Sequence, residues 1–230
     1  MPNVHDGHRQ RMFEKFNKYG FSVFNDHEKL EIILYFSVPR RDTNELAHIL
    51  LDRFKSISGV LDADEKELKK IPFITDRTIE LFSIIKETSA LYNFQKYEQK
   101  TYLNTTDEIA TYFQLFFANE RNEKVAIMGL NNKGKFMFCE YVSEGDINSV
   151  GLSTRKIVEK AISSSATVIV MCHNHPGGIA LPSGADIYVT NEIANALKSI
   201  EVHLKDHIIL SSDNDYVSMA LSKEYQYIFK

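Results

Sequence analysis

Residues 173–186 carry two histidines, a serine and an aspartate with the spacing H-x-H-x7-S-x2-D. Upstream, residues 166–172 form an apolar run rich in Val and Ile, which predicts a buried strand that leads into the first histidine. In a strand, residues i and i+2 point to the same side, so His173 and His175 are aimed at a common point while Asn174 faces away. The Pro-Gly-Gly that follows ends the strand. Two imidazoles are therefore expected at the mouth of a buried strand.

A helix is expected from Ser183 onward, which places Asp186 in its first turn, close enough to fold back toward the two rings. Two histidines and one carboxylate, with the fourth position left to water, form the ligand set of a catalytic zinc site. Ser183 and Asp186 taken alone also fit a helix capping box, and by themselves they favour that simpler interpretation. Their place directly after an H-x-H at a strand end favours a Zn²⁺ site with His173, His175 and Asp186 as ligands.

The same spacing resembles the JAMM motif of the JAB/MPN metalloenzymes. Its local form, His-Asn-His-Pro-x-Gly followed by Pro-Ser-x-x-Asp, resembles the RadC-like bacterial branch of that superfamily. The resemblance covers nearly the whole chain, with further matches at residues 7–9, 28–34, 39–43, 145, 153–155, 160–161 and 206–209. It implies an α/β fold, in which a mixed β-sheet of the cytidine-deaminase-like kind is packed between helices and is preceded by an all-helical N-terminal domain.

The resemblance also implies a general base. In JAB/MPN enzymes this base is a glutamate at the junction of the first helix and first strand of the domain, which by position falls on Glu123, with Glu120 as the runner-up. Glu140 and Glu144 are less favoured by topology and stay open, and Glu123 is alternatively an exposed loop charge. Ser183 is implied as the group that stabilises the oxyanion of a tetrahedral intermediate.

Asp206 and His207 resemble a family pair on a strand near the metal. One interpretation makes them hydrogen-bond partners of a ligand imidazole, which would fix its orientation. The other makes them an ordinary buried polar pair. The sequence leaves both open.

Composition limits the classes of protein that fit. With 27 basic and 31 acidic residues the net charge is −4, and neither half of the chain is a polycation, which disfavours strong nonspecific binding to DNA. Cys139 and Cys172, the two cysteines, lie in apolar strand-like runs, so a disulfide framework is not indicated, and alternation turns Cys172 away from the histidines. The polar N-terminus and the lack of a long apolar run predict a cytoplasmic protein with no membrane partner.

The chain is expected to hold two domains, a helical one over residues 1–100 and the JAB/MPN domain over 101–230. Residues 95–105 are polar and predict a linker between them. Residues 67–76 stand where the family has a helix-hairpin-helix-like turn, but this turn has no glycine, and its proline removes an N–H donor. A packing turn is therefore favoured over a contact with DNA.

Together these features predict a zinc metallohydrolase, a JAMM-type metallopeptidase or isopeptidase that cleaves an amide in a peptide or protein. Two alternatives remain: a DNA-associated protein of repair or recombination, and a metal-binding interaction module without activity. The sequence does not name the substrate, because function lies in the site and not in the fold.

Overall fold

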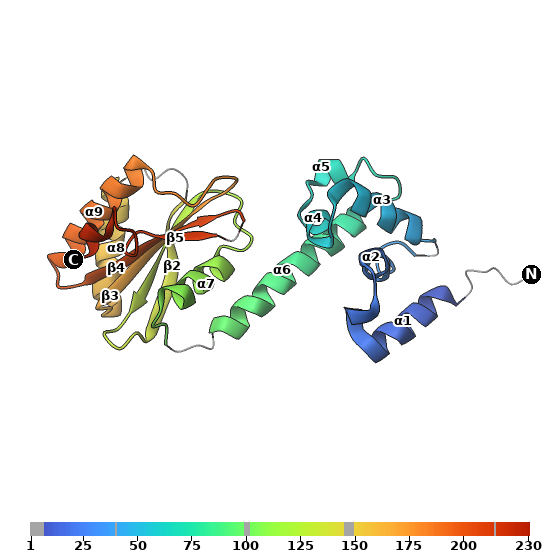
Figure 1. The fold of residues 1–230 in the computed structure, drawn as a ribbon, viewed down its shortest axis with the longest axis horizontal. Helices are drawn as coiled ribbons and strands as arrows, with labels where there is room; N and C mark the ends of the chain where they lie inside the picture. The colour runs from blue at the N-terminus through green and yellow to red at the C-terminus, as the bar shows by residue number, and fades with distance from the viewer. Residues whose placement is uncertain (1–6, 40, 99–101, 145–149, 214) are drawn as a thin grey trace, which may run out of the picture. The chain divides into compact units, whose positions relative to one another are not determined.

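The computed structural model describes residues 7–39, 41–98, 102–144, 150–213 and 215–230. The chain forms two compact units, residues 1–89 and 90–230, which are described in turn (Figure 1). The division falls within helix α6, Asp76–Glu98. The prediction of a linker at residues 95–105 is therefore wrong for 95–98, which are helical, while 99–101 lie outside the described residues. None of the helices described here is both long and apolar enough to cross a membrane.

The first unit is helical, as expected. Before α6 it contains α1 His8–Tyr19, the 3-10 turn η1 Gly20–Val23, α2 Asp26–Leu34, α3 Asn44–Phe54, α4 Ile57–Asp62 and α5 Glu65–Leu68. Leucines spaced four apart in α2 and α3 share one helix face, and they form a core with Phe82 of α6. Ile71, in the turn between α5 and α6, is buried in that core. This burial fits a packing role for the turn.

A buried carboxylate joins α1, α2 and α3. Glu31 accepts a hydrogen bond from the Tyr35 hydroxyl at 2.7 Å and one from the Asn44 amide at 3.2 Å, and it lies 3.1 Å from Nε2 of His8. Arg9 stacks on the Tyr35 ring and donates to a main-chain carbonyl. These bonds satisfy a carboxylate that is only 1% exposed, so the polar residues of α1 and α2 serve packing.

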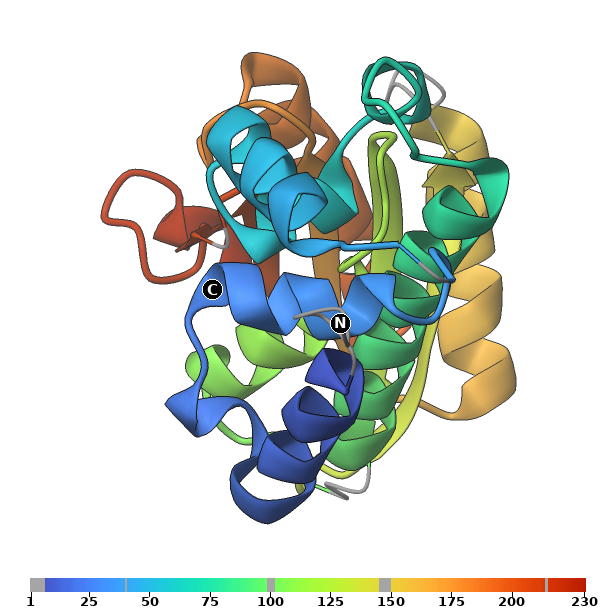
Figure 2. The same ribbon diagram turned by 90° about the vertical axis from the view of Figure 1, so that its right-hand side faces the viewer.

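The second unit is a five-stranded mixed sheet in the order β2-β1-β3-β4-β5, in which only β3 and β4 run parallel. Its strands are β1 Lys124–Leu130, β2 Phe136–Glu144, β3 Val168–His175, β4 His203–Ser211 and β5 Tyr216–Ser218. Helix α7, Thr106–Phe116, packs on one face, and α8 Val150–Ser164 and α9 Gly184–Lys198 pack on the other (Figures 1 and 2). A short 3-10 helix, η2 Gln226–Phe229, follows β5. The predicted α/β class is confirmed; β5 and η2 are additions that no sequence pattern indicated.

Strand alternation divides the buried residues of β3 between two cores. Ile169 and Met171 pack with α8 and α9, whereas Val170 and Cys172 pack with the aromatic face of α7. Both cysteines are free thiols, as expected. Continued to the end of the strand, the same alternation puts His173 on the α9 side.

Candidate metal centre

Three elements bring the chemically active side chains to one edge of the sheet. β3 ends with the two histidines, and the loop after it returns at once into α9, whose first turn carries Asp186. β1 runs antiparallel to β3 and begins where β3 ends, with Val125 opposite His173. Glu123, directly before β1, is therefore placed beside the histidines by the register of the sheet.

The four predicted side chains converge. The Nε2 atoms of His173 and His175 are 2.8 Å apart; Oδ1 of Asp186 lies 3.5 Å from Nε2 of His173, and Oδ2 lies 4.0 Å from Nε2 of His175. The ligand atoms of Glu123, His173 and His175 all lie within 4.8 Å of one another. Neighbouring ligand atoms in tetrahedral zinc coordination are about 3.3 Å apart, so the spacing between the two rings and that between His173 and Oδ1 of Asp186 are close to those of a zinc site.

Hydrogen bonds on the far side of each ring fix which nitrogen carries the proton. Nδ1 of His175 lies 3.0 Å from the main-chain oxygen of Ile179, which only accepts, so this nitrogen donates. Burial lowers the pKa of His173 to about 4, so that ring is neutral at pH 7. With Nδ1 as the donor to Ile179, the neutral form of His175 leaves Nε2 as its metal-binding nitrogen.

A series of hydrogen bonds between buried groups determines which nitrogen of His173 carries the proton. The Thr190 hydroxyl lies 2.5 Å from the main-chain oxygen of Asp186 and 2.6 Å from Nδ1 of His207. The hydroxyl has one proton, which goes to the carbonyl, so Thr190 accepts the N–H of His207. Burial lowers the pKa of His207 well below its usual value, so its Nε2 is bare and accepts the Nδ1–H of His173 at 2.8 Å.

In the neutral forms of both rings, the two Nε2 atoms, 2.8 Å apart, are the nitrogens left to bind a metal. The neutral imidazole with its distal N–H engaged is also the usual state of a zinc ligand. The hydrogen bonds behind the two rings therefore fit a pair of metal ligands.

Sequence reasoning left the Asp206–His207 pair open, and the structure separates the two residues. His207 contacts a ligand ring, whereas Asp206 accepts from the Ser218 hydroxyl at 2.6 Å and from the Ala220 N–H at 2.9 Å. Asp206 thus holds the segment around β5. Thr190 was not singled out from the sequence, although a hydroxyl four residues after a proposed ligand on the same helix face is a usable signal.

The glutamates that sequence reasoning left open have other surroundings. Glu120 pairs with Lys124 at 2.9 Å, and Glu140 pairs with Lys160 of α8. Glu144 ends β2, but its side chain lies outside the described residues. Among the glutamates whose side chains are described, Glu123 alone is grouped with the two histidines, and it is half-buried.

Ser183 forms the capping box expected from the sequence. Its hydroxyl accepts the Asp186 N–H at 3.2 Å, and the Asp186 carboxylate accepts the Ser183 N–H at 2.7 Å. The cap and the metal centre therefore share one carboxylate. Because the Ser183 oxygen acts as acceptor in the cap, its own proton can be donated to a substrate.

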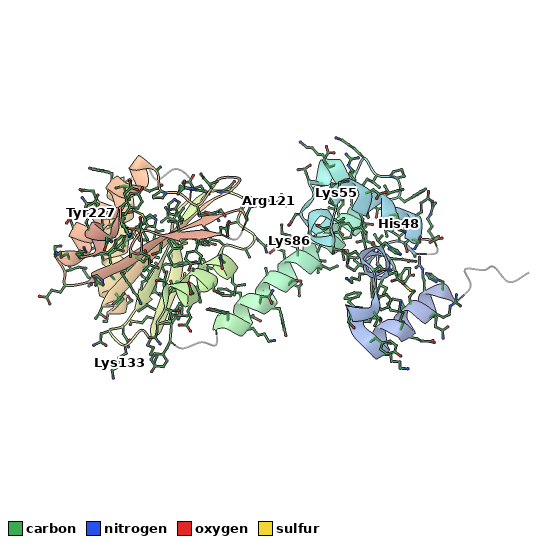
Figure 3. The ribbon with its side chains drawn as sticks, in the orientation of Figure 1. His48, Lys55, Lys86, Arg121, Lys133 and Tyr227 are labelled. Carbon is green, nitrogen blue, oxygen red and sulfur yellow. The ribbon has the colours of Figure 1, made fainter. Side chains whose placement is uncertain are left out.

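A cleft of about 350 Å³ borders the centre at His175. Its walls come from the end of α7, the loop before β1, the loop after β3 and the end of β4. Phe117 and Leu210 give it apolar surface, and Gln114, Glu120 and Ser211 give it polar groups. Arg121, labelled in Figure 3, is exposed at this cleft on the loop that carries Glu123.

Two comparisons with known proteins show what this chain is similar to. The family model described as RadC-like JAB domain matches residues 103–225, which contain all four side chains of the centre. UPF0758 protein SPO0054 of Ruegeria pomeroyi is 28% identical over 210 residues, which cover 91% of this chain and 94% of the relative.

Purified protein is expected to bind about one zinc ion per chain, as such a ligand set does. His173→Ala and Asp186→Ala each abolish stoichiometric binding because they remove a ligand and leave an incomplete set. Elemental analysis after dialysis against zinc measures the stoichiometry. His203→Ala, at an exposed histidine of β4, is the control and retains the ion. Full retention of zinc in both ligand variants would contradict the assignment.

Thr190→Val is expected to weaken zinc binding by about tenfold to a hundredfold, because His207 loses the acceptor that fixes its proton. Thr190→Ser keeps the hydroxyl and is expected to stay within about threefold of the wild type. Competition with a fluorescent chelator measures both affinities. Equal affinities for Val and Ser at this position would show that the hydroxyl has no part in ordering the ligands.

Proposed function

The chain belongs to the RadC-like JAB family, a branch of a superfamily of metal-dependent hydrolases, and from this premise we propose that it is a zinc-dependent amide hydrolase. The proposed reaction is that of a metallopeptidase or isopeptidase acting on a peptide or protein. One observation supports it most strongly: the Nε2 atoms of two histidines come together with the carboxylates of Asp186 and Glu123 beside a cleft.

When bound, zinc lowers the pKa of a coordinated water toward neutrality and polarises a carbonyl. The side chains of this protein divide the remaining work. His173, His175 and Asp186 hold the ion. Glu123 accepts the proton that the attacking water loses, and it delivers that proton to the amine nitrogen as the C–N bond breaks. The Ser183 hydroxyl would donate a hydrogen bond to the oxyanion that forms at the former carbonyl and keep its proton.

The arrangement favours Glu123 as the base and Asp186 as the third ligand, and not the reverse. Asp186 is 2% exposed and is fixed from two sides, by the Ser183 N–H and by the first turn of α9. Glu123 lies on the loop before β1 and is half-buried beside the two histidines, so its carboxylate is less constrained than that of Asp186. A general base needs this freedom, whereas a ligand needs a fixed position.

Glu123→Gln is expected to retain zinc and to lose amide hydrolysis by about a hundredfold or more, because the amide cannot take up the proton. Zinc-loaded protein is incubated with a peptide library derived from a bacterial proteome, and the new termini are counted by mass spectrometry. Glu120→Gln, three residues away and paired with Lys124, is the matched control and keeps its turnover. Cleavage at the wild-type rate in Glu123→Gln would remove this glutamate from the mechanism.

Ser183→Ala is expected to lower turnover by roughly 10²-fold through the lost oxyanion donor. It also lowers the free energy of unfolding by about 1 kcal/mol through the lost helix cap. Ser183→Thr restores both, because its hydroxyl can cap and donate. Urea unfolding and peptide turnover, measured on the same zinc-loaded samples, separate the two effects. A loss of stability without a loss of turnover in Ser183→Ala would leave only the capping role.

A further inference from the structure

Asn174 lies between the two histidines, and its side chain emerges on the opposite side of β3 from their rings. It is 7% exposed and forms part of the cleft wall. The cleft chemistry proposed above does not use it. A buried carboxamide has two donors and one acceptor group to satisfy, so its partners show what it does.

Both partners of the Asn174 carboxamide are main-chain groups of the loop before β1. Its Oδ1 accepts the Lys124 N–H at 2.8 Å, and its Nδ2 donates to the Asn122 carbonyl at 3.0 Å. These two peptide groups stand on either side of Glu123. One side chain thus holds the backbone before and after the proposed base.

The position of Asn174 in the sheet explains why a side chain is needed here. Main-chain pairing between β1 and β3 stops at Val125 and His173. The backbone of Asn174 pairs instead with Leu210 on β4. A carboxamide offers the same N–H and C=O as a peptide group, so the Asn174 side chain continues the β1 edge of the ladder by one more residue.

We propose that Asn174 is a positioning residue that sets Glu123 against the metal centre, an inference that rests on the proposed function. The strand that supplies the two ligand rings also fixes, through the residue between them, the loop that supplies the base. Ligands and base are therefore held in register by one three-residue segment. Aspartate lacks the donor, serine is too short, and leucine has the shape without either hydrogen bond.

The test compares Asn174→Leu with Asn131→Leu. Asn131 is the matched control because its Oδ1 also accepts two main-chain N–H groups, those of Lys133 and Lys135, in the turn at the other end of β1. Three quantities are measured on each protein: amide hydrogen exchange at Lys124 by NMR, zinc affinity by chelator competition, and the pH profile of peptide turnover.

In Asn174→Leu, exchange at Lys124 is expected to rise by about tenfold or more, because a buried hydrogen bond is lost. Zinc affinity is expected to stay within about threefold, since all ligands remain, while turnover falls by about tenfold or more. The limb of the pH profile that disappears in Glu123→Gln is expected to shift in Asn174→Leu and to stay in place in Asn131→Leu. Asn174→Asp, which keeps the acceptor, restores protection at Lys124 but not the bond to Asn122.

Unchanged exchange at Lys124 in Asn174→Leu would overturn the inference. So would faster exchange combined with the turnover and pH profile of Asn131→Leu, since Asn174 would then hold a loop without placing the base. Failure of the proposed function looks different: Glu123→Gln then hydrolyses peptides at the wild-type rate, while the exchange measurement still reports on the loop.

Discussion

The centre depends on two imidazole rings whose Nε2 atoms lie 2.8 Å apart at the end of a strand, while the Nδ1 atom of each ring is held by a fixed partner. Burial alone favours neutral rings but does not decide which nitrogen is bare. That choice is made by fixed acceptors, the Ile179 carbonyl for one ring and the His207–Thr190 pair for the other. The hydrogen bonds behind His173 start at the main-chain carbonyl of Asp186 in α9, which can only accept a hydrogen bond. This carbonyl therefore determines, through Thr190 and His207, which nitrogen of His173 carries the proton.

The sheet topology makes this arrangement possible. An antiparallel β1 places the start of one strand beside the end of another, and a parallel β4 brings His207 alongside β3, where its position in the ladder is opposite Met171. Helix α9 packs on the same face and supplies both Asp186 and Thr190 one turn apart. Glu123 and His207 are 84 positions apart in the sequence. They contribute to one centre because β1 and α9 begin, and β3 and β4 end, at the same edge of the sheet.

Local patterns predicted much of this from the sequence. The H-x-H at the end of an apolar run indicated where β3 ends and which way the rings point, and S-x-x-D indicated the start of α9. Strand alternation also placed Cys172 away from the rings. The roles of Thr190 and Asn174 could not be predicted, because each depends on a partner 17 to 52 residues away whose distance only the packed sheet determines.

The helical end of the predicted linker was missed because its residues are polar. Phe94 and Tyr97 of helix α6 pack against the core that contains α7, and no local composition reveals these contacts.

The capping box of α9 has a consequence for local unfolding. The Asp186 carboxylate belongs both to the first turn of α9 and to the group of side chains around the histidines. Fraying of that turn would therefore separate the carboxylate from the histidines. Helix ends in proteins commonly open at little free-energy cost, independently of the core. We therefore expect the first turn of α9, the end of β3 and the loop before β1 to open together, and an ion bound between them to raise the free energy of that opening.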